Sequence, residues 1–99
     1  MALDYLIFDA TDNGDDTGTW EALASVDESQ WPALWAEAQA LLALAQRQAP
    51  GPQGPQEDGG VWDADLQEGR DGPWCTLTVT LTGPWEWGEA LLAGLQADH

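Results

Sequence analysis

The segment from Asp9 to Glu21 carries the side chains best suited to bind a divalent cation. An EF-hand calcium loop needs acidic or amide side chains at positions one, three and five, glycine at position six and glutamate at position twelve. Counted from Asp9, Asn13 and Gly14 fit this pattern, but position twelve falls on Trp20. The flanking residues also show strand patterns where the motif needs helices. We therefore expect a solvated turn, and binding of a divalent metal or small ligand by the acidic turns is the weaker alternative.

Asp9 and Asp63 are a second candidate for chemistry, because each lies near the end of an expected strand. Two carboxyl groups placed together can act as acid and base when their environments separate their pKa values. Aspartates at strand ends also accept hydrogen bonds from the backbone of their own turns. We expect this second, structural role for both residues.

Side chains for other kinds of catalysis are scarce. Cys75 occupies a core-facing position of an expected strand, and His99 is the last residue. The chain has no lysine to form a Schiff base. It shows no glycine-rich phosphate loop before a helix and no cysteine–histidine cluster that could hold zinc. The sequence therefore predicts a protein that is not an enzyme, with no catalytic residues, metal site or cofactor.

The charge of the chain limits its partners. Eighteen acidic residues face only two basic ones, Arg47 and Arg70, for a net charge of −16. Binding to nucleic acid needs lysine and arginine to displace counterions from phosphates, so we expect no nucleic-acid ligand. Anionic membrane surfaces are disfavoured for the same reason. The charge instead favours a basic protein partner, as in immunity proteins, antitoxins and inhibitors, whose acids steer association.

Length and composition predict one domain over residues 1–99, since 43% of the residues are hydrophobic and can form a core. The single cysteine allows no disulfide within the chain. We see no signal peptide and no apolar run of about 20 residues that could span a membrane. A bacterial cytoplasmic location is therefore expected.

Four strands are predicted from alternation and from turn residues. They cover residues 2–10, 19–26, 61–66 and 74–81, with turns at 11–18 and 67–73. The inward face of the second strand is ambiguous, because Trp20, Ala22, Ala24 and Val26 compete with Leu23.

Two helices are predicted from apolar residues at three- and four-residue steps. The first follows a cap at Asp27 or Ser29, has Pro32 in its first turn and ends before Pro50. The second follows a cap at Thr82 or Gly83, with Pro84 at its first position.

The chain contains an internal repeat in which four residues recur after a constant 54 positions. The matching pairs are Asp9 and Asp63, Gly18 and Gly72, Trp20 and Trp74, and Leu23 and Leu77. We interpret residues 2–48 and 61–97 as two copies of a ββα unit, joined by a flexible Pro/Gly-rich linker at 50–60. The fold predicted is α+β, a ββαββα two-layer sandwich with a four-stranded antiparallel sheet and both helices on one face.

The candidate partner-binding residues combine exposed acids with aromatic side chains. Asp12, Asp15 and Asp16 lie in the first turn between strands, while Trp31 and Trp85 lie in the first turns of the two helices. Tryptophan is frequent both in small cores and at binding interfaces. The main alternative is a structural or assembly module that forms a homodimer through a sheet edge or the face carrying Thr76, Thr78 and Thr80.

Overall fold

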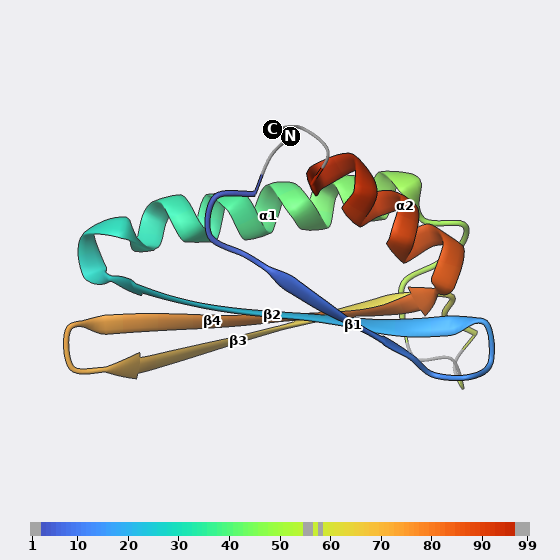
Figure 1. Cartoon of the computed structure of the whole chain (residues 1–99), viewed down its shortest axis with the longest axis horizontal. Coiled ribbons are helices and arrows are strands. Elements are labelled where there is room, and N and C mark those ends of the chain that lie inside the picture. Colours follow the sequence, from blue (N-terminus) through green and yellow to red (C-terminus); the bar gives the residue numbers. More distant parts are fainter. Residues whose placement is uncertain (1–2, 55–56, 58, 97–99) are drawn as a thin grey trace.

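The structure, a computed structural model, describes residues 3–54, 57 and 59–96 and confirms the ββαββα order. The elements are β1 (Phe8–Asp12), β2 (Thr17–Asp27), the 3-10 turn η1 (Glu28–Gln30), α1 (Trp31–Gln48), β3 (Asp63–Asp71), β4 (Trp74–Pro84) and α2 (Trp85–Gln96). Figure 1 shows a two-layer molecule in which both helices cover the same face of the sheet. The other sheet face, called here the open face, has no covering element among the described residues.

The sheet is antiparallel with the strand order β1-β2-β4-β3, an order that the sequence had left undetermined. The hairpins β1–β2 and β3–β4 meet through their inner strands, β2 and β4. These two strands pair along their full length, from Thr17↔Pro84 to Asp27↔Trp74. The centre of that pairing is Ala22↔Val79, so a pseudo-twofold axis passes near this pair.

The two halves correspond at a spacing of 57 residues. β2 runs from Thr17 to Asp27, and β4 runs from Trp74 to Pro84, so each end of β4 lies 57 residues after the same end of β2. The spacing of 54 seen in the sequence differs from this spacing of 57 by three, an odd number. Successive strand residues face opposite ways, so an odd shift exchanges the two faces. Trp20 is accordingly fully buried while Trp74 is 52% exposed. Descent of both halves from one unit stays a prediction.

The predicted first strand at residues 2–10 is wrong at its beginning, because β1 spans only Phe8–Asp12. Residue 2 lies outside the described part of the chain. Residues 3–7 leave the sheet and rise to α1, as Figure 1 shows. There the nearly buried carboxylate of Glu37 accepts hydrogen bonds from the backbone N–H groups of Tyr5, at 3.0 Å, and Leu6, at 2.9 Å. It also accepts one from Asp4. A helix side chain thus takes the place of a strand partner.

The second hairpin is longer than predicted. Residues 67–71 continue β3 instead of forming a turn, and only Gly72 and Pro73 connect it to β4. Gly72 has φ 63°, a left-handed conformation that glycine adopts without strain. The predicted cap at Thr82 or Gly83 is also wrong, because β4 continues to Pro84 and α2 begins at Trp85.

The described part of the 50–60 segment is attached to the start of the second half. The Val61 N–H donates to the Pro52 carbonyl at 2.8 Å, and the Gly54 N–H donates to the Trp62 carbonyl at 2.8 Å. Residues 55, 56 and 58 lie outside the described residues. The mobility of this linker stays a prediction.

The core centres on Trp20, whose even-numbered position on β2 faces the helices. Its ring lies 5.5 Å from that of Trp85 and 6.1 Å from that of Trp87, measured between centroids. Its indole N–H donates to Glu89 of α2 at 3.4 Å. Leu23, on the neighbouring position, is 65% exposed on the open face. The face of β2 that carries Trp20, and not the face that carries Leu23, is therefore buried.

We predict that Glu37→Ala lowers the free energy of unfolding by about 3 kcal/mol or more, because three backbone N–H groups lose a charged acceptor. Glu28→Ala is the matched control, since it removes the same charge from an exposed ion pair and should cost less than about 1 kcal/mol. Urea denaturation of both variants measures the difference. Equal losses would contradict the role assigned to Glu37.

We predict opposite effects from two glycine-to-alanine changes in α2. A Cβ at Gly88 would overlap three atoms of the Trp20 ring, so Gly88→Ala should cost about 1–3 kcal/mol by overpacking. A Cβ at Gly94 meets nothing within 4 Å. Gly94→Ala should therefore leave stability unchanged or raise it by up to about 1 kcal/mol. Thermal melts that rank the two variants in the reverse order would refute this packing.

Candidate functional site

The three predicted aspartates of the first turn are exposed, and two of them support the local backbone. Asp12 accepts a hydrogen bond from the Gly14 N–H at 2.8 Å, and Asp15 accepts from the Thr17 N–H at 3.3 Å. Asp16 adopts a positive φ of 66°, which aspartate tolerates better than most residues. These contacts build the turn, and all three carboxylates still face solvent.

The structure separates the five predicted partner-binding residues into two groups. Asp16 and Trp85 come together at one end of the sheet, where the Trp85 N–H donates to the Asp16 carbonyl at 2.8 Å. Trp31 begins α1 at the opposite end, as Figure 1 shows. The eleven residues of β2 separate these ends, a span of about 34 Å at 3.4 Å per antiparallel residue. The five residues therefore do not form one surface.

Trp85 is mainly a packing residue. It is half-buried and lies against the Trp20 ring. A Cβ added at Gly18 would lie only 2.6 Å from the Trp85 ring, so the indole also covers the backbone of β2. Its remaining surface lines a groove of about 430 Å³ together with Asp16, Pro84 and Glu86, so its role as a partner contact stays a prediction.

The candidate catalytic and metal sites do not assemble. Asp9 and Asp63 lie on β1 and β3, the two opposite edges of the sheet, so their carboxylates do not face each other. Asp63 accepts a hydrogen bond from the Ala64 N–H at 2.9 Å. Cys75 is buried, as predicted, and His99 lies outside the described residues. Within residues 3–54, 57 and 59–96, no three His, Cys, Asp or Glu side chains are grouped to hold a metal ion.

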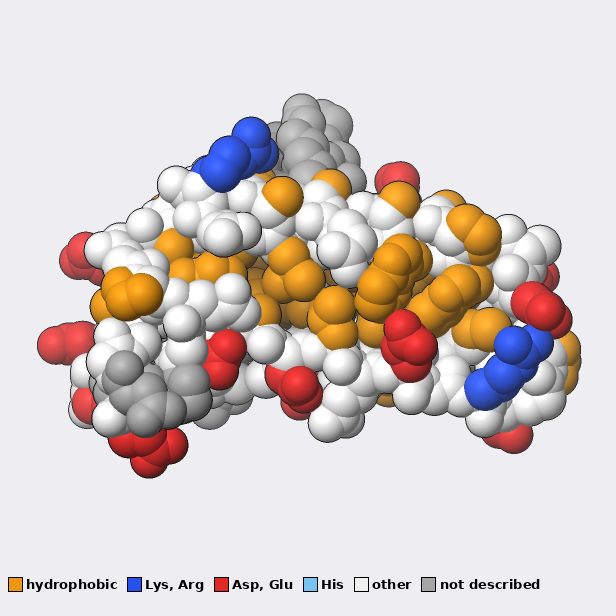
Figure 2. Space-filling model, turned by 180° about the vertical axis from the view of Figure 1, so that it is seen from behind, with side chains coloured by type: hydrophobic (Ala, Val, Ile, Leu, Met, Phe, Trp, Pro, Cys, Tyr) orange, Lys and Arg blue, Asp and Glu red, His pale blue; other side chains and the backbone are white. Residues whose placement is uncertain are grey.

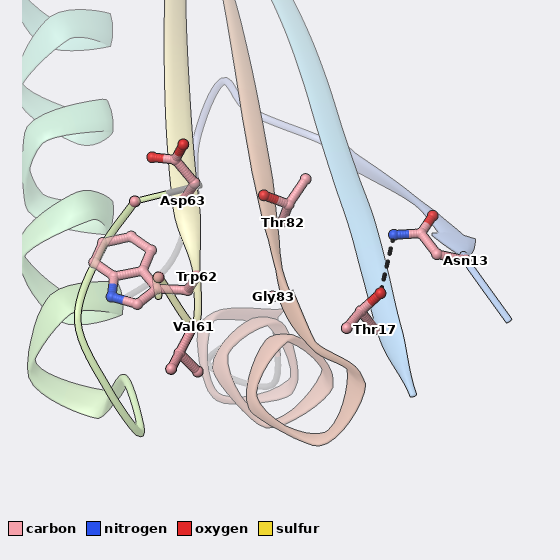
Figure 3. Close-up of a pocket in the computed structure, with 9 residues that line it drawn as sticks. Asn13, Thr17, Val61, Trp62, Asp63, Thr82 and Gly83 are labelled. Atoms are coloured by element: carbon pink, nitrogen blue, oxygen red, sulfur yellow. Dashed lines mark hydrogen bonds between the residues drawn. The ribbon is translucent and has the colours of Figure 1, made fainter. Parts of the chain in front are cut away.

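A small cavity lies between the first turn and the start of β3 (Figure 3). Its volume of about 160 Å³ is below the range of about 300–1,000 Å³ typical of small-molecule sites. The amide of Asn13 on its wall donates to the Thr17 hydroxyl at 3.3 Å and to the Thr19 hydroxyl at 3.2 Å. The Asn13 amide is thus already bonded within the protein, and the small volume makes the cavity a poor ligand site.

The end of the sheet formed by η1 and the β3–β4 turn has a different character. Trp74 is 52% exposed on the open face and lies in one row across three strands, between Asp27 on β2 and Asp71 on β3. Directly opposed residues of antiparallel strands have Cβ atoms about 5 Å apart, so both aspartates flank Trp74, and the Asp27 carboxylate also accepts a hydrogen bond from the Ser29 N–H at 2.8 Å. An exposed aromatic ring between two acids is a suitable contact for a basic side chain.

A groove lies on the helix side of the same end. It has a volume of about 440 Å³, and its lining includes Trp31, Pro32, Glu68 and Gly69. Trp31 stacks on Trp35 with 5.9 Å between ring centroids. Across one end of the groove, Arg70 and Glu28 form an exposed ion pair of 2.8 Å. We call both faces of this end, with residues Asp27, Glu28, Trp31, Glu68, Arg70, Asp71 and Trp74, the hairpin-end surface.

Sequence reasoning identified Trp31 but missed Trp74 and the acids beside it. The match of Trp74 with the core residue Trp20 concealed its exposure. Alternation along β4 contained the necessary signal, because Cys75, Leu77, Val79 and Leu81 alternate with Trp74 and the threonines. The flanking aspartates could not be found without the strand register.

The described helices include none that is both long enough and apolar enough to cross a membrane.

Asp27 keeps its charge to a lower pH than an ordinary aspartate, because hydrogen bonds from Ser29 hold its pKa below the usual value of 3.8. A lowered folded-state pKa means that this carboxylate stabilises the fold above pH 3.8 and that the contribution is lost as pH falls toward the folded value. We predict that Ser29→Ala raises the pKa of Asp27 toward 3.8, since the strongest of these bonds is removed. Carboxyl NMR titration measures the change.

The control for this titration is Ser25→Ala, which removes an exposed hydroxyl from the same strand two residues before Asp27. It should leave the titration of Asp27 as in the original protein. Identical titration curves for all three proteins would contradict the role given to Ser29.

Comparison with known proteins assigns no family to this chain. No protein family, curated protein or solved structure matches it. The function is therefore inferred from the surfaces described above.

Proposed function

We propose that this protein is a small, non-enzymatic binding module that docks a basic protein partner, in the manner of immunity proteins, antitoxins and inhibitors. The observation that carries the proposal is the row Asp27–Trp74–Asp71, an exposed indole between two carboxylates. A lysine or arginine side chain can lie on the indole face and bond a flanking carboxylate at the same time. One basic residue of the partner would satisfy both interactions.

The helix side of the hairpin-end surface supplies a second contact. The Trp31 ring lines the groove beside Glu68, so an aromatic face and an acid again lie together. Arg70 occupies part of this surface by pairing with Glu28 at 2.8 Å. Because both members of that pair are exposed, a partner's arginine can displace it at little cost.

The remaining acids act at longer range. The net charge of −16 produces a field that attracts a basic protein over a Debye length of about 8–10 Å at physiological salt. Asp12, Asp15 and Asp16 are exposed at the far end of the sheet and contribute to this steering. Such charges affect the association rate more than the lifetime of the complex.

A cytoplasmic location belongs to the same proposal. The only cysteine, Cys75, is buried and forms no disulfide, as expected in a reducing compartment. The homodimer remains the alternative, but the open face is bordered by acids on β1 and β3, including Asp9, Asp65 and Asp71. Two such faces would repel each other.

We predict that Trp74→Ala weakens binding of a fluorescein-labelled peptide of alternating lysine and valine by about three- to tenfold, through a faster off-rate, because a cation–π contact is lost. Leu23→Ala is the matched control, since Leu23 is 65% exposed on the same open face but has no flanking pair of acids. Fluorescence anisotropy and stopped-flow kinetics provide the measurements, at low and at physiological salt.

Two further comparisons test the assignment. Trp74→Ala should barely change the melting temperature, whereas Trp85→Ala should cost about 3 kcal/mol because it opens a cavity beside Trp20. A peptide of alternating glutamate and valine should not bind. The proposal fails if the lysine peptide does not bind at low salt, or if the glutamate peptide binds equally well.

A further inference from the structure

β3 is an edge strand whose outer side is largely open. It pairs with β4 on one side. On the other side the 50–60 segment covers only the beginning of the strand, where Gln53 bridges to Trp62 and its side-chain amide donates to the Asp63 carboxylate at 3.5 Å. Over Asp65–Asp71 the described residues provide no hydrogen-bond partner for the backbone on that outer side. An open strand edge of this length can pair with another extended chain.

A strip of half-buried apolar side chains runs beside this edge, between the helix layer and the sheet. Trp31, Trp35 and Leu42 lie on one side of α1, and Ala64 and Leu66 lie on the helix side of β3. A groove lies at each end of the strip. The groove beside Trp31 lies between α1 and β3, and the groove beside Leu42 lies between α1 and Trp62, the residue before β3. Figure 2 shows hydrophobic side chains along this side of the molecule, with acidic side chains below them.

The charges of β3 select what can pair with it. Among its nine residues, four are acidic and one is basic. Asp63, Asp65 and Asp71 point to the open face, since they pair with Thr82, Thr80 and Trp74 of β4. A strand added to β3 would place alternate side chains beside these acids and the others over the apolar strip. The matching pattern is basic and apolar residues in alternation.

We propose that the β3 edge accepts an extended segment of the basic partner as a fifth strand of the sheet, with basic side chains beside Asp63, Asp65 and Asp71 and apolar side chains against the α1–β3 strip. Backbone hydrogen bonds along β3 provide affinity, and the alternating pockets provide specificity. This inference rests on the proposed function, because it describes how the same partner is held.

The opposite edge lacks these features. β1 has only five residues, and the N-terminal segment beside it rises to α1, where Glu37 holds it. A second copy of this chain is also a poor occupant of β3. Pairing of two β3 strands would oppose acids to acids, which destabilises a sheet. Charged edge strands protect proteins from self-association in this way, and the same charges attract a basic strand.

The test uses three labelled peptides of alternating lysine and valine, each about ten residues long, the length of a long strand. One is unmodified, one is N-methylated at the valine nitrogens and one at the lysine nitrogens. Successive N–H groups of a strand point to opposite edges, so each methylated peptide has one edge blocked while its charge is unchanged. In the antiparallel orientation, which is the more stable, only one of the two edges can meet β3. We therefore expect one methylated peptide to lose at least about tenfold in affinity and the other to bind like the unmodified peptide.

A pair of charge variants locates the peptide on the sheet. Asp65→Lys and Asp9→Lys make the same change in net charge, at exposed positions of the open face on β3 and β1 respectively. We expect Asp65→Lys to weaken binding of the unmodified peptide by about tenfold and Asp9→Lys by less than about threefold. Equal effects would overturn the assignment to β3.

The outcomes separate this inference from the proposed function. Equal affinities for the two methylated peptides, whether kept or lost, would overturn antiparallel strand addition. Both methylated peptides could bind as well as the unmodified peptide while the glutamate peptide does not bind. This result would leave the proposed function, binding of a basic partner, intact. Failure of all three lysine peptides to bind would end both proposals. A protein that sediments as a dimer and binds no peptide would support the homodimer in place of both proposals.

Discussion

The fold depends on the burial of Trp20 between β2 and α2. Its ring is fully buried and occupies the space that side chains would take at Gly18 and Gly88. Trp85 and Trp87 pack around it, and the Trp87 ring lies 5.4 Å from that of Trp62. The Trp87 indole N–H donates to the Ala45 carbonyl at 3.3 Å, which joins α2 to α1. One large side chain therefore fixes the positions of both helices over the sheet.

The placement of these helices determines which surfaces remain available. α2 occupies the end of the sheet near the first turn, so Trp85 is used for packing. At the other end, Trp31 and Trp35 stack along α1 beside β3 and stay half-buried. The N-terminal segment, held by Glu37, occupies the opposite side of α1. Among the described residues, the fold thus leaves the long β3 edge, the apolar strip beside it and the exposed ring of Trp74 near acidic side chains.

The partner-binding proposal unites features that would each be ordinary alone. Acidic faces are common on soluble domains, and a single exposed aromatic residue needs no explanation. Here Trp74 lies between Asp27 and Asp71 by strand register, and the hydrogen bonds from Ser29 lower the pKa of Asp27. The strip along β3 continues the same combination of apolar and acidic groups. Charge complementarity explains why a basic partner suits this surface better than a second copy.

The sequence by itself determined the elements and the charge, because these depend on local patterns. Alternation along the strands, the turn residues between them and the apolar stripes of the two helices were sufficient for the ββαββα order. Which face of β2 is buried, where β1 begins and which acids border Trp74 were decided only in the tertiary structure. Each depends on strand register or on contacts between residues distant in the chain, such as Glu37 with Leu6. A shift of one residue exchanges the two faces of a strand, and local composition does not encode that choice when both faces carry apolar residues.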